Sequence, residues 1–175
     1  VKGWTWETYG LGAVFEAEAS GARTNDVWSN TGAAEKFPQT HAELYQYDTV
    51  VLANVGTLGL GYKGRRALLD FVTSGGGLVL LGGFYTLGQG RFDGTFLADL
   101  VPVDLHPADV VRADEPLPLR PAMPASPLFS GISADDWQQE PVLYWRHRLI
   151  PRQGATVHLT AGGEPILISW SPVSY

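Results

Sequence analysis

Two short apolar runs separated by a helical segment constrain the fold of this 175-residue chain most strongly. The first run, TVVLANV at residues 49–55, is rich in β-branched residues and shows no polar alternation, and the second is LVLL at 78–81. Such runs are typical of strands covered on both faces of a parallel sheet. Between them, apolar residues recur at helical spacing over residues 65–73. Strand, helix and strand in this order predict the βαβ unit of an α/β fold.

The rest of the chain predicts shorter elements around this unit. The expected elements are a helix at 11–18, a strand at 26–29, a helix capped by Thr40 and Glu43, a short helix at 95–100, and a hairpin of strands 155–160 and 165–170. Six prolines between residues 107 and 129 predict that regular structure is interrupted there. We expect a single domain over residues 1–175.

Charge and cysteine content exclude several classes of function. The formal net charge is −6, so the chain has no basic field to hold a phosphate backbone, and we expect no nucleic-acid partner. The chain contains no cysteine, which excludes disulfides, thiolate zinc sites and thiol nucleophiles. We also expect no membrane partner and a cytoplasmic location, because no apolar segment approaches bilayer length and VKGWTWETYG is no signal peptide. A first residue other than Met suggests that preceding residues are missing.

Residues 59–64, GLGYKG, match the GxGxxG pattern of dinucleotide-binding loops. In such a site an acidic residue ends the following strand and holds the ribose, whereas here that strand ends in Gly82 and Gly83. The first glycine also lies several residues beyond the preceding strand. We therefore favour an ordinary glycine loop and expect no cofactor.

Other polar residues admit both a functional and a structural interpretation. The four histidines lack metal-binding spacing, so we expect no metal site. His147, in the sequence WRHR, could line a pocket, but a lone histidine more often packs or lies at the surface. Asp135, Asp136 and Glu140 could act as paired carboxylates, although a solvated loop is the simpler interpretation. Trp4, Trp6, Tyr9 and Trp28 could stack on sugar rings or could cover the sheet.

Several longer stretches resemble a known superfamily. They are PQTHAELYQYDTVVLANVG, RRALLDFVTSGGGLVLLGG and GTFLADLVPVDL, followed by SPLFSGI at 126–132 and the stretch 141–155. Together they resemble the class I glutamine amidotransferase-like superfamily, in its glutamine amidotransferase-like and ThuA-like branch, which is related to the β-galactosidase trimerisation domain. The resemblance implies a flavodoxin-like three-layer α/β/α sandwich with a mainly parallel sheet and a C-terminal β-hairpin. It also implies a first and a last strand, which we expect this sequence to lack.

The family's catalytic cysteine is missing from the matching turn. In true class I amidotransferases a G-x-C-x-G turn carries that cysteine, and here Phe84 or, with a shifted alignment, Thr86 stands in its place. No His-x-Glu pair follows the predicted hairpin to complete a triad. Phenylalanine cannot attack a carbonyl, and threonine is a poor nucleophile without an adjacent base. We therefore assign no catalytic residue and expect no glutamine hydrolysis by the family mechanism.

The carboxyl edge of the predicted parallel sheet remains a candidate binding site, because ligands bind there in open α/β sheets. The candidate residues are Asn54, Gly56, Thr57, Gly82, Gly83, Phe84, Tyr85, Thr86, Trp145 and His147. The predicted function is a non-catalytic domain that binds a small polar ligand, with a carbohydrate suggested by the ThuA and β-galactosidase analogy. One alternative is a hydrolase or lyase that uses Tyr85 or Thr86 with His147 or an acidic residue. Another is an oligomerisation or docking module, including a homo-oligomer.

Overall fold

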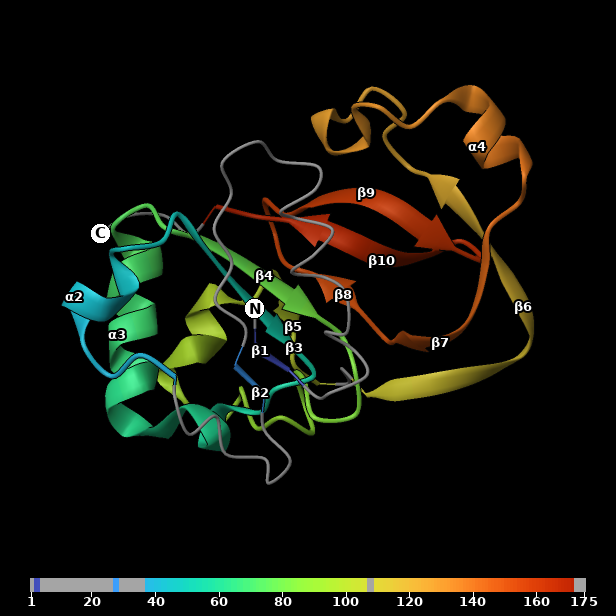
Figure 1. The fold of residues 1–175 in the computed structure, drawn as a ribbon. Helices are drawn as coiled ribbons and strands as arrows, with labels where there is room; N and C mark the ends of the chain where they lie inside the picture. The colour runs from blue at the N-terminus through green and yellow to red at the C-terminus, as the bar shows by residue number, and fades with distance from the viewer. Residues whose placement is uncertain (1, 4–26, 29–36, 107–108, 172–175) are drawn as a thin grey trace. The chain divides into compact units, whose positions relative to one another are not determined.

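The structure is a computed structural model that describes residues 2–3, 27–28, 37–106 and 109–171 (Figure 1). The chain divides into two compact units, Val1–Leu100 with Ser174–Tyr175, and Val101–Val173. A single domain over residues 1–175 stays a prediction, because compactness alone does not show that a unit folds independently. The helix expected at 11–18 and the aromatic residues Trp4, Trp6 and Tyr9 lie outside the described residues.

The first unit contains a parallel sheet built around the predicted βαβ unit. Its strands are β1 (Lys2–Gly3), β2 (Val27–Trp28), β3 (Thr49–Ala53) and β4 (Gly77–Leu81), in the order β2-β1-β3-β4. Strands β3 and β4 pair in parallel, from Thr49 opposite Gly77 to Ala53 opposite Leu81. Helix α3 (Gly61–Thr73) connects them. The predicted strand, helix and strand are therefore confirmed.

The two central strands differ in burial, contrary to the prediction that both are covered on both faces. Residues Val50–Ala53 of β3 are buried, whereas Val79 and Leu81 of β4 are 41% and 36% exposed. Strand β4 is one of the two edge strands of the described sheet, while β3 has a neighbour on each side. An apolar run does not distinguish an edge strand from a central one, because its composition records hydrophobicity and not the number of neighbours.

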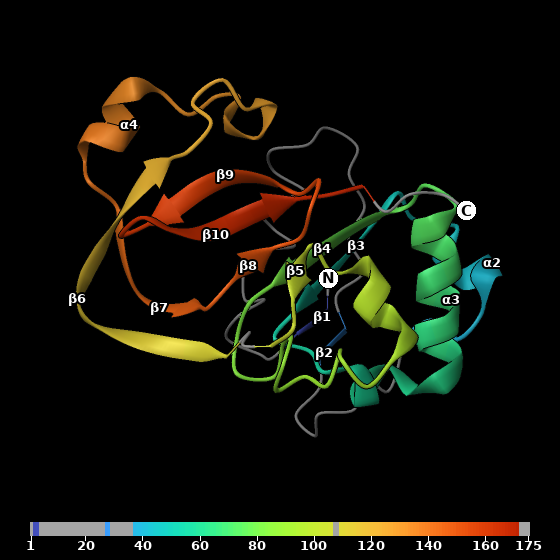
Figure 2. The same cartoon turned by 180° about the vertical axis from the view of Figure 1, so that it is seen from behind.

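Helical segments of the first unit gather on one side of β3 and β4 (Figures 1 and 2). They are α2 (His41–Leu44), the 3-10 turn η1 (Thr57–Leu60), α3, and the 3-10 turn η2 (Phe96–Leu100), the last of which was expected as a short helix. Helix α3 packs against the other three segments. The apolar side chains they bury include Leu44, Leu60, Leu68, Phe71 and Leu97. His41 also binds Asp70 of α3 through a 2.7 Å contact between Nε2 and Oδ2.

The predicted capping box begins α2. The Thr40 hydroxyl accepts a hydrogen bond from the Glu43 amide, and the Glu43 carboxylate accepts from the Thr40 and Gln39 amides at 3.1 and 2.7 Å. Hydrogen bonds to the ionised carboxylate favour the charged form, so the Gln39 amide and then Thr40 lower the pKa of Glu43 below its ordinary value of 4.5. The prediction is confirmed because the motif is local and needs no distant partner.

The GxGxxG segment begins α3, where its third glycine meets a side chain of this protein. The Gly64 amide donates to Gln39 Oε1 at 3.1 Å, and Gln39 Nε2 donates to the carbonyl oxygens of Phe37 and Leu60. A Cβ atom at Gly64 would lie 2.8 Å from both Gln39 Nε2 and Phe37 Cδ1. Glycine is therefore needed at position 64 for close packing. The Gly64 amide, which would bind a phosphate in a dinucleotide site, is instead hydrogen-bonded to Gln39.

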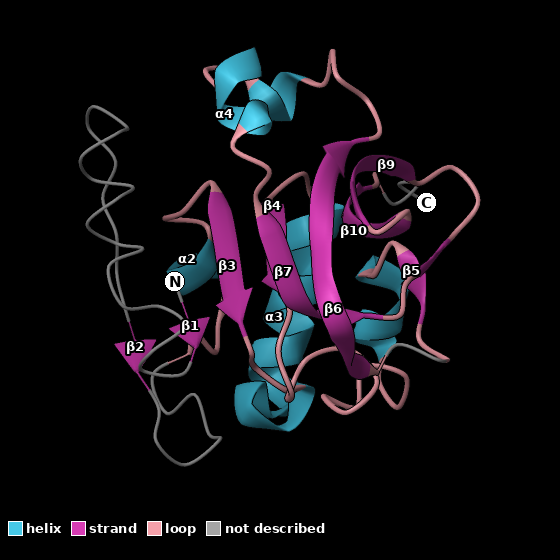
Figure 3. Cartoon of the chain, turned by 90° about the vertical axis from the view of Figure 1, so that its right-hand side faces the viewer, coloured by secondary structure: helices cyan, strands magenta, loops and turns pink. Residues whose placement is uncertain are grey.

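The second unit consists largely of antiparallel strands. They are β5 (Val103–Asp104), β6 (Val110–Pro121), β7 (Val142–His147), β8 (Ile150–Pro151), β9 (Thr156–Ala161) and β10 (Glu164–Ser169). One sheet has the order β10-β9-β6-β7, and β5 pairs with β8 separately. Figure 3 shows the long strand β6 beside β7. The expected hairpin is present as β9 and β10, whose two-residue turn places Gly162 and Gly163 at φ of 58° and 87°, as a type I′ turn requires.

The predicted flavodoxin-like three-layer α/β/α sandwich with a mainly parallel sheet is wrong. All six strands of the second unit pair antiparallel. In the described parallel sheet, only β3 and β4 are longer than two residues. The apolar runs that suggested parallel strands lie in the first 100 residues, and the pairing of the strands after residue 101 leaves no comparable periodic pattern in the sequence.

Strand β6 also corrects the expectation for the proline-rich segment. It runs for 12 residues through Pro116 and Pro118 to Pro121, and its ladder with β7 shifts register between Arg112 and Leu117. Proline removes ladder donors without preventing an extended backbone. Its first part pairs with β7 and its last three residues pair with β9. The prolines thus interrupt the ladder, not the strand.

The acidic side chains that follow β6 make hydrogen bonds and an ion pair within the second unit. Helix α4 (Ala134–Gln138) begins with a capping box, in which the Asp136 carboxylate accepts from both the amide and the hydroxyl of Ser133 at 2.7 Å. The Ser133 hydroxyl and then its amide lower the pKa of Asp136. Glu140 forms an ion pair with Arg120 at 2.9 Å, and Asp136, Glu140 and Arg120 are all exposed. Asp135 and Asp136 therefore lie in a short helix and not in the loop that the sequence suggested, while all three carboxylates are exposed to solvent as expected.

Candidate functional site

Eight of the ten candidate residues lie where β3 and β4 end. Asn54, Gly56 and Thr57 follow β3, and residues 82–86 follow β4. We call residues 82–91 the strand-end loop. The parallel pairing of β3 and β4 brings both chain segments to the same edge of the sheet, as the sequence predicted.

Asn54 connects the two segments. Its side chain is 4% exposed and its φ is 52°, a left-handed conformation that asparagine tolerates better than most residues. The main-chain amide of Tyr85 donates to Asn54 Oδ1 at 2.6 Å, and the main-chain amide of Asn54 donates to the Leu81 carbonyl oxygen at 3.1 Å. A Cβ atom at Gly83 would lie 2.4 Å from Asn54 Cγ and Oδ1. The glycine at position 83 therefore leaves room for the asparagine that holds the loop.

Thr57 fixes the far end of the strand-end loop. Its fully buried hydroxyl lies 3.1 Å from the Gly90 carbonyl oxygen and 3.0 Å from that of Arg91, and its amide donates to Gly90 at 2.9 Å. Sequence reasoning missed Gly90, where a Cβ atom would lie 2.4 Å from the Tyr85 carbonyl oxygen. The sequence feature that could have identified Gly90 is its position in the segment TLGQG, where glycines recur. Both ends of the loop are thus held by residues that follow β3.

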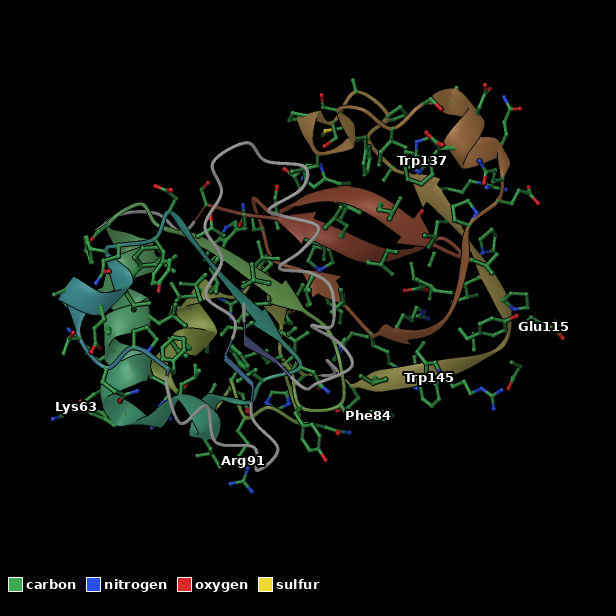
Figure 4. The ribbon with its side chains drawn as sticks, in the orientation of Figure 1. Lys63, Phe84, Arg91, Glu115, Trp137 and Trp145 are labelled. Atoms are coloured by element: carbon green, nitrogen blue, oxygen red, sulfur yellow. The ribbon has the colours of Figure 1, made fainter. Side chains whose placement is uncertain are left out.

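The side chains of the strand-end loop divide into buried and exposed groups. Thr86 is 2% exposed, and its hydroxyl donates to the Leu81 carbonyl oxygen at 3.3 Å. Phe84 and Tyr85 are 52% and 50% exposed. Figure 4 labels Phe84 and Arg91, which both come from this loop, and Arg91 points away from the ribbon. The loop therefore presents two aromatic side chains while the threonine closes its interior.

The turn after β4 lacks the geometry of a nucleophile elbow. An elbow holds its nucleophile on a strained turn between a strand and a helix. None of residues 82–86 has a positive φ, and turns, not a helix, continue to residue 91. The hydroxyl of Thr86 is buried and directed at a main-chain carbonyl, which cannot serve as a base. The loop can stack on a ligand or hydrogen-bond to it, but Thr86 is not placed to attack one.

The remaining two candidates, Trp145 and His147, lie on β7 in the second unit. They are two residues apart and therefore share a face of the strand. Trp145 is 52% exposed and pairs with Arg112, whereas His147 is buried and pairs with Val110. Figure 4 labels Trp145 on this strand.

Two kinds of feature are absent from the described part of the chain. Residues 2–3, 27–28, 37–106 and 109–171 contain no group of three or more histidine, cysteine, aspartate or glutamate side chains that could hold a metal ion. Within the same ranges no helix has both the length and the apolar character needed to cross a bilayer.

Two solved structures resemble this fold. Cytoplasmic protein STM3548 from Salmonella typhimurium superposes with a TM-score of 0.75 at 23% identity, over 94% of this chain and 69% of its own. Cytoplasmic protein STM1381 from Salmonella typhimurium LT2 gives 0.68 at 22% identity, over 79% of this chain and 62% of its own. The likeness at these identities concerns the fold alone, and this chain spans roughly two thirds of either protein. The chain matches none of the curated proteins.

A family model covers nearly the whole chain. The model described as "Putative glutamine amidotransferase" matches residues 5–171, which include both strand ends and the strand-end loop. This match agrees with the resemblance found in the sequence, and the chain still contains no cysteine. The protein therefore belongs to this glutamine amidotransferase-like family.

Proposed function

We propose that this glutamine amidotransferase-like protein is non-catalytic at its strand-end loop and that it binds a small polar ligand, such as a carbohydrate, at this loop. The observation that carries the proposal is the pair of half-exposed aromatic side chains, Phe84 and Tyr85, on a loop held by Asn54 and Thr57. A loop already held by hydrogen bonds loses little conformational entropy when it binds.

The chemistry of the loop favours an uncharged polar ligand. Tyr85 offers an apolar ring and a hydroxyl group, a combination suited to the mixed apolar and polar surface of a sugar. We also propose a cytoplasmic location, supported by the names of the two Salmonella proteins of similar fold.

Catalysis at the loop is less well supported than binding. The alternative of a hydrolase or lyase that uses Thr86 is disfavoured, because the Thr86 hydroxyl is buried and donates a hydrogen bond to the Leu81 carbonyl oxygen. Tyr85 remains exposed, and a reaction there would need a base within hydrogen-bond reach of its hydroxyl. An oligomerisation or docking module stays a prediction, as does a homo-oligomer.

A thermal-shift screen tests the binding proposal. The protein is screened against neutral sugars, sugar acids, glutamine and nucleotides, together with Phe84→Ala and Tyr85→Ala. A ligand at a hundred times its dissociation constant adds about 2.7 kcal/mol of stability. Tyr144→Ala is the matched control, because Tyr144 is 48% exposed, close to the 50% of Tyr85, and lies on β7 of the second unit.

The expected result is a shift with a sugar that both loop variants lose and the Tyr144 control retains. A shift that survives both loop substitutions would place the ligand elsewhere. The absence of any shift, with a protein that light scattering shows to be an oligomer, would favour the docking module instead.

A further inference from the structure

Three polar side chains meet in the second unit, away from the residues of the strand-end loop in the sequence. His158 on β9 lies 2.7 Å through Nδ1 from the Ser126 hydroxyl and 2.7 Å through Nε2 from the Ser169 hydroxyl at the end of β10. Both ring nitrogens of one histidine are therefore bonded to serines. Ser126 belongs to the segment just before the 3-10 turn η3 (Pro127–Phe129).

The three residues differ in exposure in a way that matters for reactivity. His158 and Ser126 are each 5% exposed, whereas Ser169 is exposed. Ser169 also lies on β10, the outer strand in the order β10-β9-β6-β7. The arrangement runs from a buried serine through a buried histidine to a serine that solvent can reach.

The protonation of His158 decides what the outer serine can do. The Ser126 oxygen accepts from the Leu128 amide at 3.2 Å, and a hydroxyl oxygen has a second lone pair for a proton on Nδ1. With Nδ1 protonated, Nε2 is an acceptor for the Ser169 hydroxyl. A nucleophile bonded to a base, which a third group orients in turn, is the arrangement that activates serine hydroxyls in enzymes.

We propose that Ser169 is a nucleophile for ester substrates, with His158 as its general base and Ser126 as the residue that positions the histidine. The Ser169 oxygen forms a bond to the carbonyl carbon of the ester, and its proton passes to His158 Nε2. The bond from that carbon to the alcohol oxygen breaks, and the leaving alcohol takes the proton from Nε2. Water then attacks the acyl-serine with His158 again as base, which releases a carboxylic acid and restores Ser169.

A purely structural role is the competing explanation. The His158 carbonyl oxygen accepts from the amides of Ala122 and Met123, so this strand already binds the segment that leads to Ser126. The side-chain contacts could simply strengthen that attachment. A structural contact requires no enhanced reactivity at Ser169, and the two explanations therefore predict different chemistry.

The first test uses a fluorophosphonate probe, which reacts with activated serine hydroxyls. The expected result is a single covalent adduct that peptide mass spectrometry places at Ser169. Ser169→Ala should remove it, while the control Ser130→Ala should keep it, because Ser130 is also exposed in the second unit. Absence of an adduct, or an adduct at another serine, would overturn the proposal.

The second test uses the absence of cysteine from the wild-type chain. Ser169→Cys introduces one thiol beside His158, and Ser130→Cys introduces one exposed thiol as a control. A neighbouring histidine lowers a thiol pKa from about 8.5. Iodoacetamide should therefore alkylate Ser169→Cys about threefold to tenfold faster than the control at pH 6.5. Equal rates would contradict activation by His158, and the comparison leaves the buried histidine in place.

The third test concerns Ser126 as a positioning residue. Nitrogen-15 NMR distinguishes the two neutral forms of the His158 ring, and the proposal predicts a proton on Nδ1 in the wild type. Ser126→Ala should shift the population toward a proton on Nε2 and reduce probe labelling. A wild-type ring protonated on Nε2 would contradict the assigned roles. All three tests concern the second unit, so their failure leaves ligand binding at the strand-end loop unaffected.

Discussion

Asn54 combines a buried side chain, a left-handed backbone and a hydrogen bond to the strand-end loop at one position. These properties make different demands on a substitution. Glycine accepts the backbone conformation but supplies no acceptor for the Tyr85 amide, whereas alanine fails on both counts. Variants at this position can therefore separate the two contributions.

We expect Asn54→Ala to be more destabilising than Asn54→Gly. Loss of the acceptor for the Tyr85 amide costs about 1–3 kcal/mol in either variant. The left-handed backbone adds roughly 1–2 kcal/mol for alanine alone. Urea unfolding of both variants measures the difference, and equal stabilities would show that the backbone conformation carries no strain.

Gly83 is expected to tolerate no side chain. In Gly83→Ala the new methyl group would lie 2.4 Å from Asn54 Cγ, so the asparagine must move and its bond to Tyr85 must lengthen or break. Overpacking of this kind costs about 1–3 kcal/mol. Gly94→Ala is the matched control, because its nearest neighbour would be the Arg91 carbonyl oxygen at 3.8 Å. Thermal unfolding that fails to distinguish the two variants would contradict the described packing.

The sequence predicts which residues reach the sheet edge but not what each does there. Apolar strands followed by glycines place Asn54 and residues 82–86 together, because parallel strands end at one edge. The burial of Thr86 and the need for glycine at position 90 depend on how the loop folds back on Thr57, more than thirty residues away in sequence. Such long-range contacts leave no periodic signal.

At the scale of the element, the capping box at α2 gives a dependence on pH. The native pKa of Glu43 lies below its ordinary 4.5, so the carboxylate stabilises the folded state above about pH 4.5. That contribution is lost as the pH falls through the lowered native pKa, because the protonated group accepts the Gln39 and Thr40 amides less well. We expect faster hydrogen exchange of these two amides in acid.

The control for this prediction is Glu43→Gln, which retains an acceptor but no titratable group. Its exchange, corrected for the intrinsic rate, should not change across the same pH range. Thr40→Ala should lower the free energy of unfolding by about 1 kcal/mol. A Glu43 carboxyl that titrates at or above 4.5 by NMR would contradict the described contacts.

Elements set by local pattern were predicted well, and those set by their neighbours were not. The capping box, the helix between β3 and β4 and the hairpin turn rest on residues close in sequence. The exposure of β4 and the continuity of β6 through its prolines depend on which strands lie beside them. Tertiary context decides both.

At the scale of the whole molecule, family membership was recognisable while the architecture was not. The matching stretches extend along most of the chain, as does the family model over residues 5–171. The prediction of a mainly parallel sandwich assumed that the βαβ pattern of the first 100 residues continues through the rest of the chain. Strands β5 to β10 of the second unit instead pair antiparallel, and among these pairs β9 and β10 are joined by a two-residue turn.

Membership in this family does not bring its cysteine chemistry to the chain. We expect no release of ammonia from glutamine, because the chain has no cysteine to form a thioester and Thr86 is buried. A coupled assay for glutamate and ammonia measures this directly. Activity above background that Tyr85→Ala abolishes would contradict a non-catalytic strand-end loop.

The most direct measurement is an amide NMR titration of the protein with the best sugar from the thermal-shift screen. Binding at the strand-end loop predicts chemical-shift changes concentrated at Asn54–Thr57 and at residues 82–91, led by the Tyr85 amide that Asn54 holds. Shifts concentrated on β7 around Trp145, or no saturable shifts at all, would contradict the account.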